Sequence, residues 1–143
     1  MEKFKQHLKD YKKKFVSIRF TKETNEKLME YCKDNNVAVP SDFVFHLTVM
    51  YSSNEMKYEN SKEKMSTILE PKSIGKLGDA AVIHIKNSKE VIQKFDLLKS
   101  KGFKHSYPSL KQHVSISYEN VDISNMKIPD FNLTTEYFIV EDQ

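Results

Sequence analysis

Two short segments decide the fold of this chain: 45–51, with the sequence FHLTVMY, and 112–118, with the sequence QHVSISY. Both contain the motif His-x-Thr/Ser inside an apolar run that is typical of a β-strand. Successive side chains of a strand point to opposite faces, so the histidine and the hydroxyl residue of each motif share one face. If the two strands lie side by side, two imidazoles and two hydroxyls converge on one cleft. The four residues are His46, Thr48, His113 and Ser115.

The two motifs belong to a longer internal repeat, in which the histidines are 67 residues apart (113 − 46). In each copy an apolar strand precedes a hydroxyl residue, Thr21 or Ser88, which can cap the helix predicted to follow. Each predicted helix runs to a residue that tolerates a positive φ, Asn35 or Asn36 in the first copy and Gly102 in the second. The repeated unit is therefore strand, helix, loop and motif strand.

This repeat, at about residues 15–52 and 80–119, predicts an α+β fold. Two strand-helix-strand lobes are therefore expected. The length favours a single domain over residues 1–143. Residues 1–14 are predicted to form at most a short leading helix, and the apolar run Tyr137–Val140 is predicted to form the last strand.

Composition limits the partners and the compartment. The 23 basic and 20 acidic residues give a net charge of +3, which favours anionic ligands only weakly and does not suggest a duplex-binding protein. The single cysteine, Cys32, excludes an internal disulfide and is expected to be a small buried residue. No apolar run is long enough to span a membrane or to act as a secretory signal. We expect a cytoplasmic protein, a monomer or weak oligomer, without membrane or stable duplex partners.

The motif residues suit phosphodiester cleavage. That reaction needs a base for the attacking oxygen, an acid for the leaving oxygen and hydrogen-bond donors for the phosphoryl oxygens. Histidine fits the first two roles because its pKa lies near 6.5, so that at neutral pH one ring can be neutral and the other protonated. The sequence offers no carboxylate cluster of the kind that two-metal enzymes use, so no metal or other cofactor is expected.

A structural role is the alternative for any single histidine in a strand, but two copies at matched positions of a repeat favour function. The other histidines lack this support. At the repeat offset His84 corresponds to Ser17, and His7 and His105 fall in polar segments, so surface or edge positions are expected for all three.

Other matched or clustered residues are given structural roles. Tyr51 and Tyr118 occupy equivalent positions in the repeat and are expected to face away from the histidines and to pack in the core. The run Lys12–Lys14 is expected to be a solvated surface rather than a ligand clamp.

The two motifs and their repeat resemble the 2H phosphoesterase superfamily over about residues 15–118. The resemblance implies duplicated strand-helix-strand lobes with two small antiparallel sheets around a central groove. The stretch 98–118, LKSKGFKHSYPSLKQHVSISY, and the first motif resemble in addition the phage anti-CBASS phosphodiesterases, which degrade the cyclic di- and trinucleotide signals of bacterial immunity. The resemblance implies that two histidines act as acid and base and that two hydroxyls donate to the phosphate. These residues are His46 and His113, with Thr48 and Ser115.

The resemblance also implies substrate-binding positions. The family places a base-stacking aromatic near the position of Ile74, just before Gly75, where this chain has an aliphatic residue. A late acidic residue that lines the pocket corresponds best to Glu141, with Glu136 as the alternative. The second motif departs from the family pattern in two places, with Gln112 in place of the common proline and a serine in place of the usual threonine.

The activity implied is a metal-independent phosphodiesterase that cleaves the 3′,5′ bonds of cyclic di- or trinucleotides in the bacterial host cytoplasm. One alternative is an RNA 2′,3′-cyclic phosphodiesterase or RNA-end ligase of the same superfamily, which would use the same four residues. The other is a protein that binds nucleotides without turnover. Two intact motifs argue against a pure binder, which would not need both imidazoles.

Overall fold

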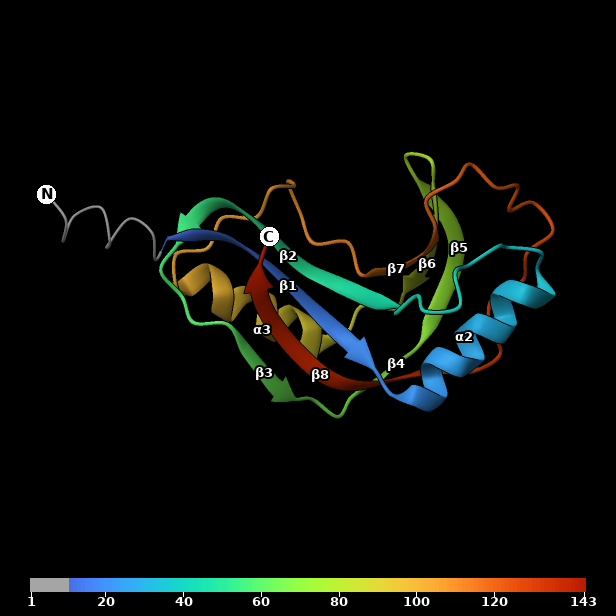
Figure 1. Cartoon of the computed structure of the whole chain (residues 1–143), viewed down its shortest axis with the longest axis horizontal. Coiled ribbons are helices and arrows are strands. Elements are labelled where there is room, and N and C mark those ends of the chain that lie inside the picture. The colour runs from blue at the N-terminus through green and yellow to red at the C-terminus, as the bar shows by residue number, and fades with distance from the viewer. Residues whose placement is uncertain (1–10) are drawn as a thin grey trace, which may run out of the picture.

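The computed structural model describes residues 11–143, in which an eight-stranded antiparallel sheet is flanked by two helices (Figure 1). The strands are β1 (Lys12–Phe20), β2 (His46–Met56), β3 (Ser61–Lys64), β4 (Ile68–Leu69), β5 (Pro71–Leu77), β6 (Ala80–Ile85), β7 (His113–Ser117) and β8 (Leu133–Asp142). The helices are α2 (Lys22–Asp34) and α3 (Lys89–Ser100). The strand order is β3-β8-β1-β2-β7-β6-β5, and β4 also pairs with β8.

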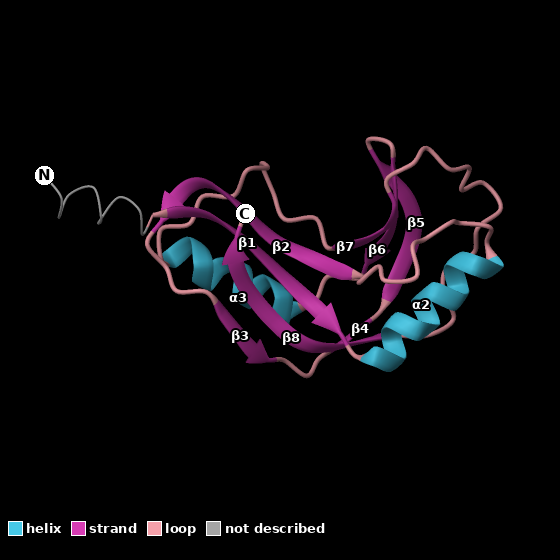
Figure 2. Cartoon of the chain, viewed as in Figure 1, coloured by secondary structure: helices cyan, strands magenta, loops and turns pink. Residues whose placement is uncertain are grey.

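The sheet consists of two halves, one for each copy of the repeat (Figure 2). Strands β3, β8, β1 and β2 form the first half, and β7, β6 and β5 form the second. They meet where β2 runs antiparallel to β7, and the register there contains the single pair Leu47 and Val114. The expected α+β fold with two small antiparallel sheets is confirmed, and the structure adds that these sheets join at the two motif strands.

Both helices begin and end where the sequence indicates. The side chain of Thr21 accepts a hydrogen bond from the amide of Thr24 at the start of α2, and Ser88 does the same for α3. After α2, Asn36 has a φ of 58°, and after α3, Gly102 has a φ of 98°. These left-handed residues end each helix and turn the chain toward the next motif strand.

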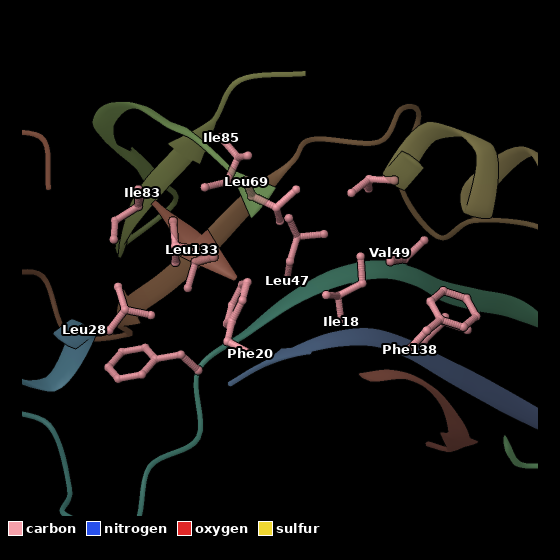
Figure 3. Close-up of a cluster of buried hydrophobic side chains, with 14 of the residues drawn as sticks. Ile18, Phe20, Leu28, Leu47, Val49, Leu69, Ile83, Ile85, Leu133 and Phe138 are labelled. Carbon is pink, nitrogen blue, oxygen red and sulfur yellow. The ribbon is translucent and has the colours of Figure 1, made fainter. Parts of the chain in front are cut away.

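The core lies on the side of the sheet that carries the helices and is built from the alternate side chains of both halves. Ile18, Leu47 and Val49 of the first half are fully buried, as is Ile83 of the second. Figure 3 shows these side chains in one cluster with Leu28 of α2. The core residue of each motif therefore points into this cluster, which leaves the other face of the strands for the motif histidines and hydroxyls.

The two ends of the described chain pair with each other. The predicted last strand is present and longer than its apolar run, and β8 lies inside the sheet between β3 and β1. Residues 12–14 begin β1, so the expectation of a helix through them is wrong, and residues 1–10, with His7, lie outside the described part. Lys14 is also not solvated: it is 3% exposed, and its Nζ lies 2.5 Å from Oδ1 of Asp142.

Candidate active site

His46 and His113 are the first residues of adjacent strands, β2 and β7, and each is fixed in the same way. Nδ1 of His46 lies 3.5 Å from the carbonyl oxygen of Val44, and Nδ1 of His113 lies 2.7 Å from that of Lys111. A carbonyl oxygen can only accept, so this geometry requires the proton on Nδ1 when the ring is neutral. Both imidazoles are thus left with Nε2 free to exchange a proton.

The hydroxyl residues of the two motifs line one cavity of about 720 Å³. Thr48 and Ser115 meet there with His113, as expected from the strand pattern. The residues that line the cavity within 11–143 do not include His46, although this ring is close enough for a charge on His113 to lower its pKa. The remaining lining residues are Tyr51, Leu77, Gly78, Ala80, His105, Tyr107, Pro108, Ser109, Leu110, Lys111 and Tyr118.

Burial lowers the pKa of both motif histidines. For His46, the charge of Arg19 lowers the pKa further, while the bond to the Val44 carbonyl and the charge of Glu141 oppose the shift. For His113, the bond to the Lys111 carbonyl opposes the shift that burial causes, and the charges of His84 and Lys111 add to it. Neutral imidazole is therefore favoured at both positions before an anionic ligand binds.

The register of the strands corrects the expectation for His84. In the first half Arg19 lies opposite His46, and in the second half His84 lies opposite His113. His84 therefore corresponds to Arg19 and not to Ser17, because two additional residues, 86–87, separate β6 from its helix cap in the second copy. Each motif histidine thus has a basic cross-strand neighbour on the same face of the sheet.

Gly75 makes room for His84. A Cβ at Gly75 would lie 2.6 Å from Nε2 of His84, which is shorter than any normal contact. The imidazole therefore lies over the backbone of β5, directly across the sheet from His113.

Glu141 is held beside the first motif, whereas Glu136 is not. Oε1 of Glu141 lies 3.3 Å from a terminal guanidinium nitrogen of Arg19, whose Nε donates to Oγ of Ser17 at 3.1 Å. Glu136 lies 3.9 Å from Nζ of Lys64 on β3, at the edge of the sheet. Of the two candidates, Glu141 is the one that the structure brings close to His46.

Ile74 does not reach the site. It is paired with Ile83, whose side chain is fully buried, and it packs against the hydrophobic core. The cavity lining from this hairpin comes instead from its turn, at Leu77, Gly78 and Ala80. The alternation of β5 turns the side chain of Ile74 to the core face, and the substrate contact expected at position 74 stays a prediction.

Both motif strands contain a β-bulge, which corrects the expectation for Tyr51 and Tyr118. Val49 is an extra residue in β2, and Ile116 is an extra residue in β7, at equivalent positions of the repeat. One inserted residue reverses the alternation of the strand beyond it. Both tyrosines therefore turn toward the cavity and line it instead of packing in the core.

The structure corrects the expectation for His105 and agrees with the expectation for Cys32. His105 is half-buried, pairs through its backbone with Ser52 and lines the cavity, so it is not an ordinary surface residue. Cys32 is buried on α2, and burial raises the pKa of its thiol to about 12, which leaves a protonated apolar side chain as expected.

A comparison with known protein families decides the relationship. The family model described as anti-CBASS protein Acb1 matches residues 12–142. This chain belongs to that family. The match includes both motif strands, both helices and the last strand, so the resemblance seen in the motif residues extends over nearly the whole chain.

The fold of this Acb1-family chain is similar to that of a solved 2H phosphoesterase, described as the crystal structure of E. coli LigT in apo form. The two share 13% identity with a TM-score of 0.62, over 91% of this chain and 86% of the other. Such a likeness shows the fold alone. No curated protein sequence matches the chain significantly. The family supports an anti-CBASS role, which belongs to phage evasion of bacterial immunity.

Neither helix in residues 11–143 combines the length and the apolar character needed to span a membrane. The same residues contain no group of three or more His, Cys, Asp or Glu side chains placed to hold a metal ion.

Sequence reasoning missed Arg19, His84 and the cavity tyrosines. One signal could have indicated Arg19, because it is the only arginine among 23 basic residues and lies in an apolar strand. Arginine is the basic side chain best suited to planar contacts with phosphate or carboxylate. The other positions depend on two extra loop residues and on two bulges, which no local pattern marks.

Proposed function

We propose that this chain is a metal-independent phosphodiesterase that hydrolyses the 3′,5′ bonds of cyclic di- or trinucleotides, acting as a single domain in the bacterial cytoplasm. The observation that carries the proposal is the matched placement of two imidazoles. His46 and His113 begin adjacent strands, and each has Nδ1 held by the carbonyl of the residue two positions earlier. Membership in an anti-CBASS family supports the choice of substrate.

In the proposed reaction one imidazole is neutral and the other is protonated. Nε2 of the neutral ring takes the proton of the attacking oxygen, either from water or from the 2′-hydroxyl, as that oxygen bonds to phosphorus. The bond from phosphorus to the leaving oxygen breaks, and the protonated ring gives its proton to that oxygen. Thr48 and Ser115 donate hydrogen bonds to the non-bridging oxygens, which carry the charge.

The basic neighbours assist by binding charge. Arg19 and His84 lie beside the two motif histidines, and Lys111 lines the cavity. Their charges favour an anionic ligand and keep the free imidazoles neutral. Glu141 pairs with Arg19 and opposes the lowering of the His46 pKa, whereas no carboxylate acts on the pKa of His113, so the two halves of the site are electrostatically unequal.

The decisive experiment offers the purified protein a panel of substrates in EDTA and analyses the products by chromatography. The panel contains cyclic dinucleotides, a cyclic trinucleotide and an RNA that ends in a 2′,3′-cyclic phosphate. Opening of the cyclic oligonucleotides supports the proposal. Turnover of the RNA end alone favours the related RNA phosphodiesterase, and binding without any turnover favours a nucleotide-binding protein.

The rate is expected to depend on pH with an optimum on the acid side of 6.5. Active enzyme has one neutral and one protonated histidine, so kcat/KM peaks between the two pKa values, and burial lowers both. The phosphate of a bound substrate raises both pKa values, so the kcat profile should lie at higher pH than the kcat/KM profile. Measurement of both between about pH 4 and 9 tests this; coincident profiles, or a flat one, contradict it. The limbs belong to the coupled pair and not to either ring.

Removal of divalent metal is expected to leave the rate unchanged. All the proton transfers are assigned to histidines and the charge stabilisation to hydroxyls and basic side chains, so no step needs a Lewis acid. The rate is measured in EDTA and again after addition of Mg²⁺, Mn²⁺ or Zn²⁺. A loss in EDTA that one of these ions reverses would replace the two-histidine mechanism with a metal-assisted one.

A further inference from the structure

We propose that the cavity beside the second motif is a nucleobase subsite, in which Tyr107 and Tyr118 provide the stacking surfaces. This inference rests on the proposed function, because it assigns one end of the same substrate. It also supplies the aromatic contact that Ile74 cannot make.

The cavity brings aromatic rings and phosphate donors into one space. Thr48 and Ser115 come from the motif strands, Tyr107 from the loop before β7 and Tyr118 from the residue just after it. The volume of about 720 Å³ lies in the range of small-ligand sites. A nucleotide whose phosphate meets the two hydroxyls can therefore place its base against the tyrosines.

Both tyrosines expose their rings. Tyr107 is 61% exposed and Tyr118 is 63% exposed, whereas Tyr51 between them is half-buried. Scattered apolar side chains on a surface need no explanation, but these two line the same cavity as the motif hydroxyls. Exposed aromatic faces beside phosphate-binding groups are the arrangement by which proteins hold unpaired bases.

A connected set of rings holds Tyr107 in place. Phe15 stacks on Tyr51 with centroids 4.7 Å apart, and Tyr51 meets Tyr107 edge to face at 6.4 Å. Tyr107 also contacts His105 at 5.6 Å. The charge effects of both Tyr107 and Tyr118 on the pKa of Tyr51 agree with three phenols grouped at one place. The ring of Tyr107 is thus held in place before the ligand arrives, which lowers the cost of binding.

The charge of the lining suits a nucleotide. It contains Lys111, His105 and His113, and none of the lining residues is a carboxylate. An anionic ligand with an aromatic group fits this wall better than a neutral sugar does, since the lining combines basic side chains with exposed aromatic rings. The chemistry therefore indicates a base joined to a phosphate.

The test measures binding of a cyclic dinucleotide with 2-aminopurine in place of one base, in the background of His46→Ala so that the probe is not consumed. Stacking on an aromatic ring quenches the fluorescence of this base. Tyr118→Leu and Tyr107→Leu are each expected to weaken binding by about 5- to 150-fold, which is the loss of 1–3 kcal/mol of stacking. Both are also expected to reduce the quenching.

Two controls separate stacking from general damage. Tyr118→Phe keeps the ring and is expected to bind and quench as the parent does. Tyr58→Leu removes a tyrosine that lies outside the cavity and packs on Phe103, and it is expected to leave the affinity unchanged. Weaker binding of the probe by Tyr58→Leu or Tyr118→Phe would overturn the subsite. Full affinity in both Tyr107→Leu and Tyr118→Leu would do the same.

The proposed subsite and the proposed hydrolysis can be contradicted independently of each other. In the His46-intact chain, the leucine variants are expected to raise KM more than they lower kcat. If the intact chain binds and quenches the probe but opens no cyclic oligonucleotide, the proposed hydrolysis is wrong and the subsite stands. If it opens these substrates and the leucine variants keep the parental KM and affinity, the hydrolysis stands and the subsite is wrong.

Discussion

His46→Ala and His113→Ala are each expected to lower kcat/KM by about 10²- to 10⁴-fold, the usual cost of losing a general acid or base. Each variant loses one free Nε2 beside the phosphate, while both hydroxyls and the basic neighbours remain. Binding should therefore persist. Rates are measured by chromatography of the ring-opened product, and the midpoint of thermal unfolding is measured to confirm that each variant is folded.

The double variant provides the matched control. Groups that act as a unit are not additive, so His46→Ala/His113→Ala should be little slower than the slower single variant. A single variant that keeps nearly the full rate would contradict the mechanism. Losses that multiply in the double variant would indicate two independent roles in place of one coupled proton transfer.

A nitrophenyl ester of a nucleotide can identify the acid. Nitrophenolate leaves without a proton, so the variant that lacks the acid should recover most of its rate on this substrate. The variant that lacks the base should stay slow. Whichever of His46→Ala and His113→Ala recovers on this substrate therefore lacks the acid, and the one that stays slow lacks the base.

Leu47→Ala is expected to lower the free energy of unfolding by about 2–5 kcal/mol, the range for a buried leucine replaced by alanine. Leu47 is fully buried, and it pairs with Val114 at the one register contact between the two halves of the sheet. The cavity left by this substitution opens at the seam that carries both motifs. Unfolding in urea gives the free energy, and loss of activity should accompany loss of stability.

Two further variants set the scale for this result. Leu47→Met nearly conserves the volume and should cost less than about 1.5 kcal/mol. Ile68→Ala removes a side chain that is 64% exposed and should change stability by no more than about 0.5 kcal/mol. A cost below about 1 kcal/mol for Leu47→Ala would mean that the seam tolerates a cavity and that the halves are held together elsewhere.

Much of the fold could be predicted because its signals are local. The alternation around His46 and His113, the caps at Thr21 and Ser88 and the left-handed Gly102 each act within a few residues. The four motif residues follow from those strands. Their convergence required only that the two strands be neighbours, which the repeat suggested.

The remaining parts of the site depend on contacts that no short segment contains. Bulges at Val49 and Ile116 arise from how each strand pairs, and each reverses the side chains beyond it. A strict alternation therefore placed Tyr51 and Tyr118 on the wrong face. The residue that corresponds to His84 was predicted wrongly for a related reason. A constant offset between the two copies cannot account for the two residues that the second copy adds after its strand.

The place of β8 in the sheet has a consequence for synthesis of the protein. This strand lies between β3 and β1, and it brings Glu141 to Arg19 beside the first motif. On the ribosome, β1 and β2 emerge early and can pair with each other, but β1 lacks its second neighbour until residues 133–142 have been made. Because such long-range pairing is slow, the half of the sheet made first is completed last. Domains usually fold from the N-terminus during translation, whereas here the half of the sheet that carries His46 is completed only after β8 has been synthesised.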